Sequence, residues 1–564
     1  MHAPSREELA ELLFGDADDP LSALRWNLAE LRRALGTNVS IGGDPVRIEL
    51  PAEATVDVWK LTRGEWREGL EVLAEAGELL AGVAIDASAV YEIWLLSERR
   101  RLSGAAAAIL REGVHARFAA GNARGAVDLA RRLVERDPID EGAQELLVRM
   151  LAASGDREAA RLQQRHAIDL ISRELGTEPG PALRAAAEPP PTAAGGAGGM
   201  RAAAAARLET GEAAMAAGAS EAGIRSLRDA VAAAEVAGDA ELRARALVAL
   251  GAALVHGMRG FDGEAAGFLH EAADAAAEVG DLEVGARAAR ELGYVEMLRG
   301  RYDNADRWLE QAIGLASRHP GELAWGYAVR GAARGDRGRH QLARHDLGLA
   351  LELARGHELP DVEAWALTFR GRGQLLVDDL VGAREDLEAA VAAALRARWT
   401  AFVPLPMAFL ADVWRRQGRR PEAEGGYERA FAMALQLDDP CWEGIAGRGL
   451  GLIAADRGDQ DVAFDRLATA RRRCVRLPDA WLWVEAYCLD ALAALAVAED
   501  PRGAETWIAD LEGLAARTGM GELLARAYLH RARLGDPDAA RAVVVLAAEV
   551  ENPSLVRDVS AVRP

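Results

Sequence analysis

The sequence predicts an all-α protein, and three observations support this. Half of the 564 residues are apolar, and Ala, Leu and Val dominate that half, which suits many thin helical interfaces better than a β core. Apolar residues recur at helical spacing, and a period of about 40 residues occupies the C-terminal part. Because the chain is too long for one compact core, we expect two to four domains.

Composition argues against several classes of chemistry. Lys60 is the single lysine among 67 basic residues, so a Gly-x-x-x-x-Gly-Lys-Ser/Thr phosphate loop is absent from the sequence. The sequence has three cysteines, and none of them form a C-x-x-C pair: Cys441, Cys474 and Cys488. Their number and spacing therefore indicate neither a disulfide framework nor a zinc site. The ten histidines include no His-Glu-x-x-His motif. We therefore expect no metal, no cofactor and no enzymatic activity.

Charge and hydropathy indicate a cytosolic protein. Residues 1–13 carry four charged side chains where a signal peptide would be apolar. The uncharged stretch at residues 399–411 is interrupted by Pro404 and Pro406 and is too short to cross a bilayer of roughly 30 Å. The net charge of -21 disfavours coating of nucleic acid, but a small basic face can still bind DNA because the local field decides.

Two helices and a strand are expected in residues 1–52. A capping box at residues 5–8 opens a helix over residues 7–14, and Asp19-Pro20 opens a second helix that runs to Leu35, with Gly36 behind it. A strand-like run at residues 46–50 precedes Pro51. Four leucines at spacings of 4, 3 and 4 form the predicted buried stripe of the second helix: Leu24, Leu28, Leu31 and Leu35.

Residues 53–186 are also predicted to be helical, with other landmarks. Asp137-Pro138 is predicted to cap one helix, Gly155 to end another, and Gly176 with Pro179-Gly180 to stop the last. Three prolines followed by glycines then predict a linker at residues 187–199. Residues 200–564 form the remaining segment.

The third segment repeats itself. Alanines recur at gaps of 40, 38, 40, 40 and 40 residues, and each is followed four residues later by Leu or Tyr and seven later by Ala. Offsets of 4 and 7 share one helix face, and the small residues let a neighbouring helix approach closely. The anchor alanines are Ala265, Ala305, Ala343, Ala383, Ala423 and Ala463.

Before each of these helices runs another amphipathic stretch that ends in a turn, as in Asp336-Arg-Gly-Arg-His340. A unit of two helices must stack on its neighbours to bury its apolar face, so we expect an α-solenoid of about eight or nine units. Leu-Gly in the first helix and Ala after the turn resemble the tetratricopeptide repeat family. Eight tryptophans at helical positions are expected to pack or, on a concave face, to anchor a ligand: Trp308, Trp325, Trp365, Trp399, Trp414, Trp442, Trp481 and Trp483.

Several strings in residues 55–183 occur in the order typical of one family. Residues 94–102 read Trp-Leu-Leu-Ser-Glu-Arg-Arg-Arg-Leu, residues 136–141 read Arg-Asp-Pro-Ile-Asp-Glu, and residues 173–180 read Arg-Glu-Leu-Gly-Thr-Glu-Pro-Gly. This segment resembles the bacterial transcriptional activator domain of the SARP family. The members of that family are actinobacterial regulators. The resemblance implies a transcription regulator with RNA polymerase as a protein partner and a homodimer as an assembly.

In that family a winged helix precedes the activator domain. The string at residues 24–36 is similar to the recognition helix of OmpR-type winged helices, with residues 41–49 as the wing. The match starts at the second helix of such a domain, so we expect either a start upstream of Met1 or a reduced binding module. The resemblance implies seven DNA-binding residues, with Arg33 and Arg47 on phosphates: Ser22, Arg25, Trp26, Asn27, Arg32, Arg33 and Arg47.

The chemistry of these residues suits DNA, because Asn can read adenine and Arg can read guanine. We therefore expect a cytosolic regulator that contacts promoter DNA through residues 1–52, contains an activator domain at residues 53–186 and receives a protein or small-molecule signal on the solenoid. The alternative is an interaction scaffold that no longer binds DNA. Residues 187–564 carry a net charge of -13, so such a scaffold should prefer basic partners.

Overall fold

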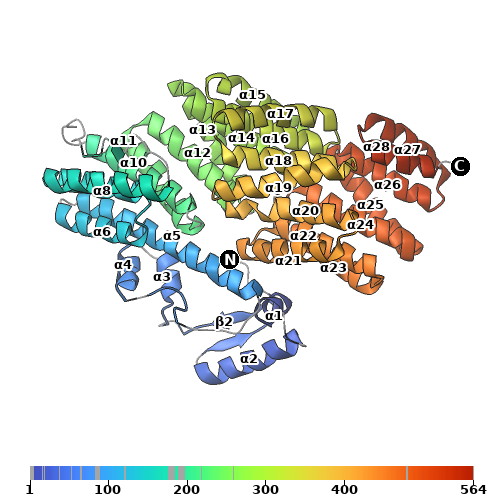
Figure 1. Ribbon diagram of the computed structural model, residues 1–564, viewed down its shortest axis with the longest axis horizontal. Helices are drawn as coiled ribbons and strands as arrows, with labels where there is room; N and C mark the ends of the chain where they lie inside the picture. Colours follow the sequence, from blue (N-terminus) through green and yellow to red (C-terminus); the bar gives the residue numbers. More distant parts are fainter. Residues whose placement is uncertain are drawn as a thin grey trace. The chain divides into compact units, whose positions relative to one another are not determined.

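The structure is a computed structural model of the chain. It describes residues 5–14, 17, 19–36, 39–51, 54–63, 66–75, 77–82, 89–119, 122–175, 179, 183–184, 186–187, 197–216, 219–257, 260–477 and 480–562. The chain divides into two compact units, Met1–Ala253 and Leu254–Pro564 (Figure 1). Most of the expected linker lies outside the described residues, and the domain boundaries drawn from the sequence remain predictions.

Helices make up nearly all of the described structure, which confirms the all-α prediction. Among the described residues, strands occur in one two-stranded antiparallel hairpin. No helix in that part of the chain combines the length and the apolar character that crossing a bilayer requires.

Unit 1 begins with a front module of two helices and the hairpin. Its elements are α1 (Arg6–Phe14), α2 (Pro20–Leu35), β1 (Ser40–Gly42) and β2 (Arg47–Glu49). Ile41 lies opposite Ile48 in the antiparallel register. The α2 helix starts where the sequence predicts, because the Asp19 carboxylate accepts a hydrogen bond from the Ser22 amide at 2.9 Å.

The second part of unit 1 is a stack of helices around one core. Its helices are α3 (Asp57–Arg63), α4 (Trp66–Glu75), α5 (Ala89–Ala119), α6 (Ala123–Arg136), α7 (Glu141–Ala153) and α8 (Arg157–Leu175). The predicted cap at Asp137 is wrong: Asp137 follows the last turn of α6, and Asp140 caps α7 by accepting from the Ala143 amide at 3.0 Å. The Asp137 carbonyl accepts from the Asp140 amide at 3.2 Å, so Asp137-Pro138 forms a turn between α6 and α7.

The first repeat helices pack on this stack. They are α10 (Ala197–Ala216), α11 (Ser220–Ala237) and α12 (Ala240–Gly257), which crosses the division between the units. Small side chains of α5 and of the α10–α11 pair form one buried cluster, which includes Ala105, Ala108 and Ala214. Arg225 on α11 also donates to the carbonyl of Thr62 at 2.7 Å.

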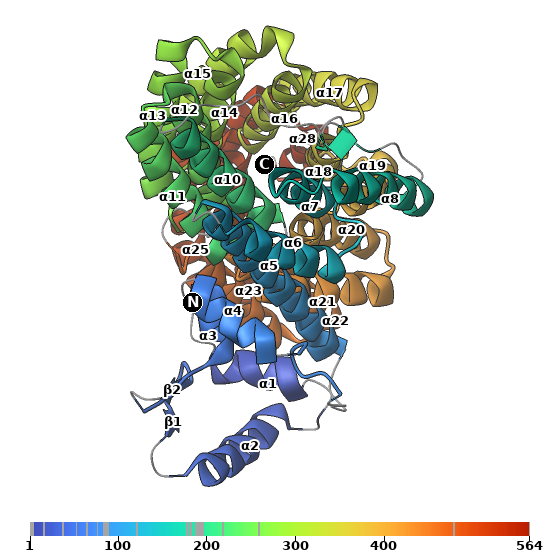
Figure 2. The same cartoon turned by 90° about the vertical axis from the view of Figure 1, so that its left-hand side faces the viewer.

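Unit 2 is an array of antiparallel helix pairs that stack side by side (Figures 1 and 2). The array consists of α13 (Asp262–Val279), α14 (Leu282–Leu298), α15 (Tyr302–Leu315), η1 (Ala316–Arg318), α16 (Pro320–Asp336), α17 (His340–Gly356), α18 (Pro360–Leu376), α19 (Leu380–Arg396), η2 (Thr400–Phe402), α20 (Pro404–Arg416), α21 (Arg420–Leu437), α22 (Pro440–Arg457), α23 (Gln460–Cys474), α24 (Leu482–Glu499), α25 (Pro501–Thr518), α26 (Gly521–Arg533), α27 (Pro537–Glu549) and α28 (Pro553–Ala561).

The 40-residue register predicts the packing correctly. All six anchor alanines are buried, as are the Leu or Tyr side chains four residues later. The partner of Leu309 and of Leu467 is the glycine of a Leu-Gly pair in the preceding helix: a Cβ built on Gly293 would lie 2.6 Å from Leu309 Cγ, and one on Gly451 would lie 2.8 Å from Leu467 Cγ. The glycine of the Leu-Gly signal therefore makes room for the next helix.

Candidate DNA-contacting surface and repeat interior

The front module has a small one-sided core. Ala10, Leu24, Leu28, Ile41 and Val46 are buried together, with contributions from α1, α2 and the hairpin. The predicted stripe is half wrong, because Leu31 is 39% exposed and Leu35 is 45% exposed. Within the described structure, other residues of the module pack on Leu24 and Leu28 only, so Leu31 and Leu35 face solvent.

All seven candidate DNA-binding side chains are exposed on this module. Trp26 is 62% exposed, which is unusual for a large apolar ring. The spacing of α2 places Ser22, Arg25, Trp26 and Arg33 on one side, opposite the buried leucines. Asn27 lies outside this group because it is not three, four or seven residues from those positions.

Local bonds hold several of these side chains. Arg32 Nε donates to the Ile41 carbonyl at 2.8 Å and so joins α2 to β1. The Asn27 amide donates to the Ala23 carbonyl at 3.0 Å, and Arg33 pairs with Glu30 at 2.6 Å. Arg25 and Arg47 have no hydrogen bond or ion pair within the described residues. Both arginines are exposed in the described structure.

Hydrogen bonds stabilise the charged carboxylate of Asp19, the N-cap residue of α2. The Ser22 hydroxyl donates to Asp19 at 2.7 Å and the Ser22 amide donates to the same carboxylate. These bonds lower the pKa of Asp19, with a smaller contribution from Arg25. The carboxylate is thus charged at neutral pH, at the positive end of the helix dipole.

The helical stack behind the front module contains a perturbed histidine. Burial lowers the pKa of His115 on α5 to about 4, and the positive charges of Arg111, Arg149 and Arg207 lower it further. Arg111 forms an ion pair with Asp140 at 2.6 Å, which joins α5 to the cap of α7. His115 is therefore neutral at physiological pH.

Aromatic rings form a continuous seam through unit 2. The seam consists of Trp325, Trp365, Phe369, Trp399, Phe402, Trp442, Trp481 and Trp483. Trp365, Trp442, Trp481 and Trp483 are buried, so the packing interpretation of these rings is confirmed. The seam fills the interior between α16, α18 and the starts of α20, α22 and α24.

A buried ion pair closes the array on itself. Arg372 on α18 is 1% exposed and lies 2.7 Å from Asp336 on α16. Trp481 donates to the other oxygen of Asp336 at 2.9 Å across 145 residues of chain, and Arg372 lies over the ring of Trp483 at 4.4 Å. Burial raises the pKa of Asp336 and Arg372 opposes that shift. The ion pair therefore joins the neighbouring repeats of α16 and α18, and Trp481 and Trp483 link it to a distant repeat.

Two further carboxylates are paired in the same interior. Burial raises the pKa of Glu522 on α26, but Arg526 and His340 together lower it to about 2, and His340 Nε2 lies 2.7 Å from Glu522 Oε2. Asp490 on α24 behaves alike: the bond to His530 at 2.8 Å and the charge of Arg526 outweigh burial and lower its pKa to about 2. Both groups are ionised at neutral pH.

No group of three or more His, Cys, Asp or Glu residues among the described residues could hold a metal ion. Cys441, Cys474 and Cys488 are buried free thiols. A hydrogen bond with Cys488 and burial raise the pKa of Cys474 well above its usual value. Such a thiol is protonated and unreactive, as expected for core packing.

Sequence comparison assigns the middle of unit 1. Residues 53–189 match the bacterial transcriptional activator domain. The resemblance drawn from the strings in residues 55–183 is thereby confirmed for this domain. The comparison with curated protein sequences gave no match.

The comparison with solved structures gave matches at low identity and low TM-score. A Rap protein complexed with competence and sporulation factor has 14% identity and a TM-score of 0.44, and the match covers 56% of this chain and 89% of that one. Yeast Tom70 has 14% identity and a TM-score of 0.31, with 81% and 95% covered. A signal transduction ATPase with a tetratricopeptide repeat sensor from Pyrococcus horikoshii has 12% identity and a TM-score of 0.36, with 61% and 51% covered.

The buried ion pairs are the features that the sequence did not point to. Asp336 stands in a turn string that predicts only a helix end. Its partner Trp481 lies 145 residues away, and a repeat period indicates contacts between neighbours rather than between distant units. The equivalent positions of other repeats carry Leu298, Leu376, Arg416 and Asp456, so the repeat register does not single out Asp336.

Proposed function

We propose that the protein is a transcription regulator whose front module contacts promoter DNA and whose repeat array receives a protein or small-molecule signal. The observation that carries the proposal is the match of residues 53–189 to the bacterial transcriptional activator domain. The exposed polar side of α2, directly before that domain, supports the DNA contact. RNA polymerase and a second copy of the chain are the proposed protein partners.

The contact with DNA would be made by α2 and the wing hairpin. The α2 helix carries three arginines against one glutamate, and Arg47 adds a charge on the hairpin. Trp26 and Ser22 lie beside these arginines on the exposed side of α2. A small basic face of this kind binds phosphates while single Arg or Asn side chains read bases, at about 1–3 kcal/mol for each good pair.

Salt-dependent binding tests this proposal. Fluorescence anisotropy would follow binding of the full chain to a labelled duplex from its own upstream region at several salt concentrations. Each phosphate contact contributes a slope of about -0.9 in log K against log salt. We expect Arg25→Ala and Arg47→Ala each to remove about one unit of slope without loss of fold, because neither arginine is bonded within the described structure.

Matched variants separate DNA contact from general charge. Arg344→Ala on α17 removes an exposed arginine of unit 2 that has no bond within the described residues, and it should leave the slope unchanged. Arg32→Ala is less informative, because it also breaks the bond to Ile41. A flat salt response in the wild-type chain, with no specific duplex bound, would contradict DNA binding by the front module.

The alternative function is an interaction scaffold that no longer binds DNA. One observation favours it: Glu30 lies on α2 and neutralises Arg33, and acidic groups beside phosphate weaken binding. The charge of -13 on residues 187–564 would then select basic protein partners. Capture of a basic partner by both the wild type and Arg25→Ala, with no binding of DNA by either, would support the scaffold.

A further inference from the structure

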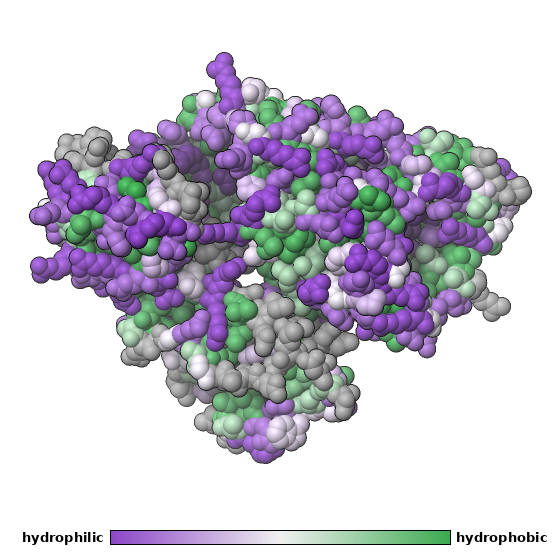
Figure 3. All heavy atoms as spheres, in the orientation of Figure 1, coloured by the Kyte–Doolittle hydropathy of each residue, from purple (hydrophilic) through white to green (hydrophobic). Residues whose placement is uncertain are grey.

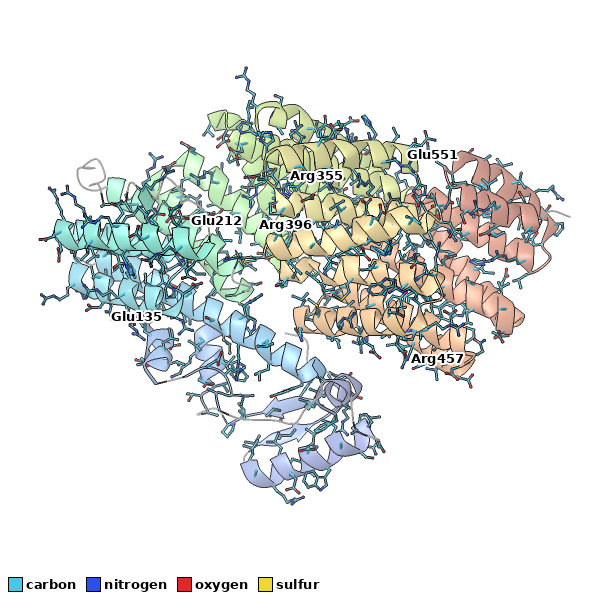
Figure 4. The ribbon with its side chains drawn as sticks, in the orientation of Figure 1. Glu135, Glu212, Arg355, Arg396, Arg457 and Glu551 are labelled. Atoms are coloured by element: carbon cyan, nitrogen blue, oxygen red, sulfur yellow. The ribbon has the colours of Figure 1, made fainter. Side chains whose placement is uncertain are left out.

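The helix pair α10–α11 of unit 1 is covered along only half of its length. The two antiparallel helices run side by side in Figure 1, and Figure 4 labels Glu212 of α10 towards the turn that joins them. Near this turn, Ala105 and Ala108 of α5 pack against the pair in one buried cluster. Among the described residues, the half of the pair farther from the turn is an open groove of about 460 Å³, which we call the edge groove.

Most of the edge groove is apolar. Its apolar lining consists of Met200, Ala203, Ala232, Ala233 and Val236, which lie at the spacing of one face on each helix. The side chain of Val236 is 74% exposed, the largest fraction among the exposed large apolar residues of the described structure, and Met200 is 42% exposed. The outer face at the end of a repeat array is normally polar. An apolar groove at this edge therefore gains stability when another surface removes it from water.

Two charged residues mark one end of the edge groove. Arg207 on α10 and Asp229 on α11 are both exposed, and neither forms an ion pair within the described structure. A Cβ built on Gly211 would lie 2.6 Å from Leu227 Cγ, which fixes the register of the two helices. In this register Arg207 lies opposite Asp229, while Met200 lies opposite Val236. The groove therefore has a charged end and an apolar end.

This pattern is complementary to a second copy of itself. A two-fold axis parallel to the helices sets α10 of one copy against α11 of the other at the same level. Arg207 then faces the partner's Asp229 and Met200 faces the partner's Val236, so that two ion pairs flank an apolar contact. A two-fold axis across the helices would set the charged end against the partner's apolar end. The charges would then lose water without gaining a partner, so the parallel axis is favoured.

We propose that the edge groove is an interface between two copies of the chain, in which Arg207 and Asp229 pair across the two-fold axis. The proposal assigns a surface to the second copy named in the proposed function, and it rests on that part of the proposed function alone. Stable interfaces bury about 1,200–2,000 Å², which is more than a groove lined by a few side chains supplies. We therefore expect a reversible dimer with a dissociation constant on the order of 10 µM.

Sedimentation equilibrium of the full chain, from about 1 to 200 µM, tests the interface. The wild type should associate reversibly to a dimer. Arg207→Asp and Asp229→Arg each set like charges opposite one another, so each should weaken association by about tenfold or more. An equimolar mixture of these two variants should regain the association of the wild type, because a heterodimer restores both ion pairs. Circular dichroism would show that each variant keeps its helices.

Matched variants keep the test specific to the groove. Val236→Ser should weaken association, whereas Val381→Ser on α19, at a valine that is 62% exposed, should not. Arg161→Asp makes the same charge change at an exposed position on α8 and should also associate as the wild type does.

Three outcomes would overturn the proposal. They are a wild type that stays monomeric throughout, a mixture that associates no better than either variant alone, and a folded Arg207→Asp variant that dimerises as strongly as the wild type. Because the samples contain no DNA, these outcomes are independent of the salt-dependent binding that tests the contact with DNA.

Discussion

Charged residues have opposite environments in the front module and in the repeat array of unit 2. Arg25 and Arg47 of the front module are exposed and unbonded within the described structure, whereas Arg372 and Asp336 of the array are buried and paired. An exposed, unbonded charge can serve a partner, and a buried pair specifies which parts of the chain meet. The surface drawn in Figure 3 is mostly hydrophilic, so recognition on that face would depend on charge.

The largest expected effect tests the buried pair. Arg372→Met should destabilise unit 2 by about 3–5 kcal/mol, because it leaves the buried Asp336 carboxyl group without its cation inside the array. Urea unfolding followed by tryptophan fluorescence would measure the loss. Arg384→Met removes half of an exposed pair with Glu388 at 4.0 Å and should cost less than about 0.5 kcal/mol. Equal losses for both variants would contradict the closure by Arg372.

Acidification should destabilise the two units at different pH values, unit 1 first. His115 has a pKa of about 4 in the folded state and about 6.5 when unfolded, so the unfolded chain binds more protons between these values. The stability of unit 1 is therefore complete above pH 6.5 and declines by up to about 3 kcal/mol as the pH falls to 4. Hydrogen exchange of α5 and α7 at pH 7, 5.5 and 4.5 would show it.

Unit 2 should respond at lower pH. Glu522 and Asp490 have lowered pKa values of about 2, so the stability they contribute is present above about pH 4.5 and is lost as the pH falls towards 2. The variant His115→Gln should remove the earlier loss in unit 1, and His166→Gln, an exposed change on α8, should not. Simultaneous loss in both units at pH 5.5 would contradict this order.

Alanine substitutions at two glycines in equivalent turns would test whether distant repeats are in contact. Gly300 and Gly418 both have left-handed φ angles, 67° and 79°, so alanine costs about 1–2 kcal/mol of backbone strain at each. A Cβ at Gly300 would also lie 2.6 Å from Thr518 Cγ2, whereas nothing lies within 4 Å at Gly418. We expect Gly300→Ala to cost about 1–3 kcal/mol more than Gly418→Ala in urea unfolding. Equal costs would mean that the distant turn does not touch Gly300.

Local signals in the sequence predicted local structure well. The Asp19-Pro20 start of α2 and the buried repeat alanines are confirmed, because caps and helix periodicity depend on residues a few positions apart. The cap of α7 was placed three residues early, at Asp137 instead of Asp140, because both aspartates suit a cap and only the fold selects one. Contacts such as Glu551 with Gln341 depend on how the whole array curves, which no local pattern encodes.

The same limit explains the leucine stripe of α2 and gives the smallest expected effect. Periodicity marks a face but cannot say how far along the helix that face is covered. Leu24 is buried and Leu35 is 45% exposed, so Leu24→Ala should cost about 2–3 kcal/mol and Leu35→Ser less than about 0.5 kcal/mol. Hydrogen exchange of the front module in both variants would compare them. A Leu35→Ser loss as large as that of Leu24→Ala would mean that another surface covers the end of α2 in solution, and the exposed side of the helix would then be narrower than the DNA contact requires.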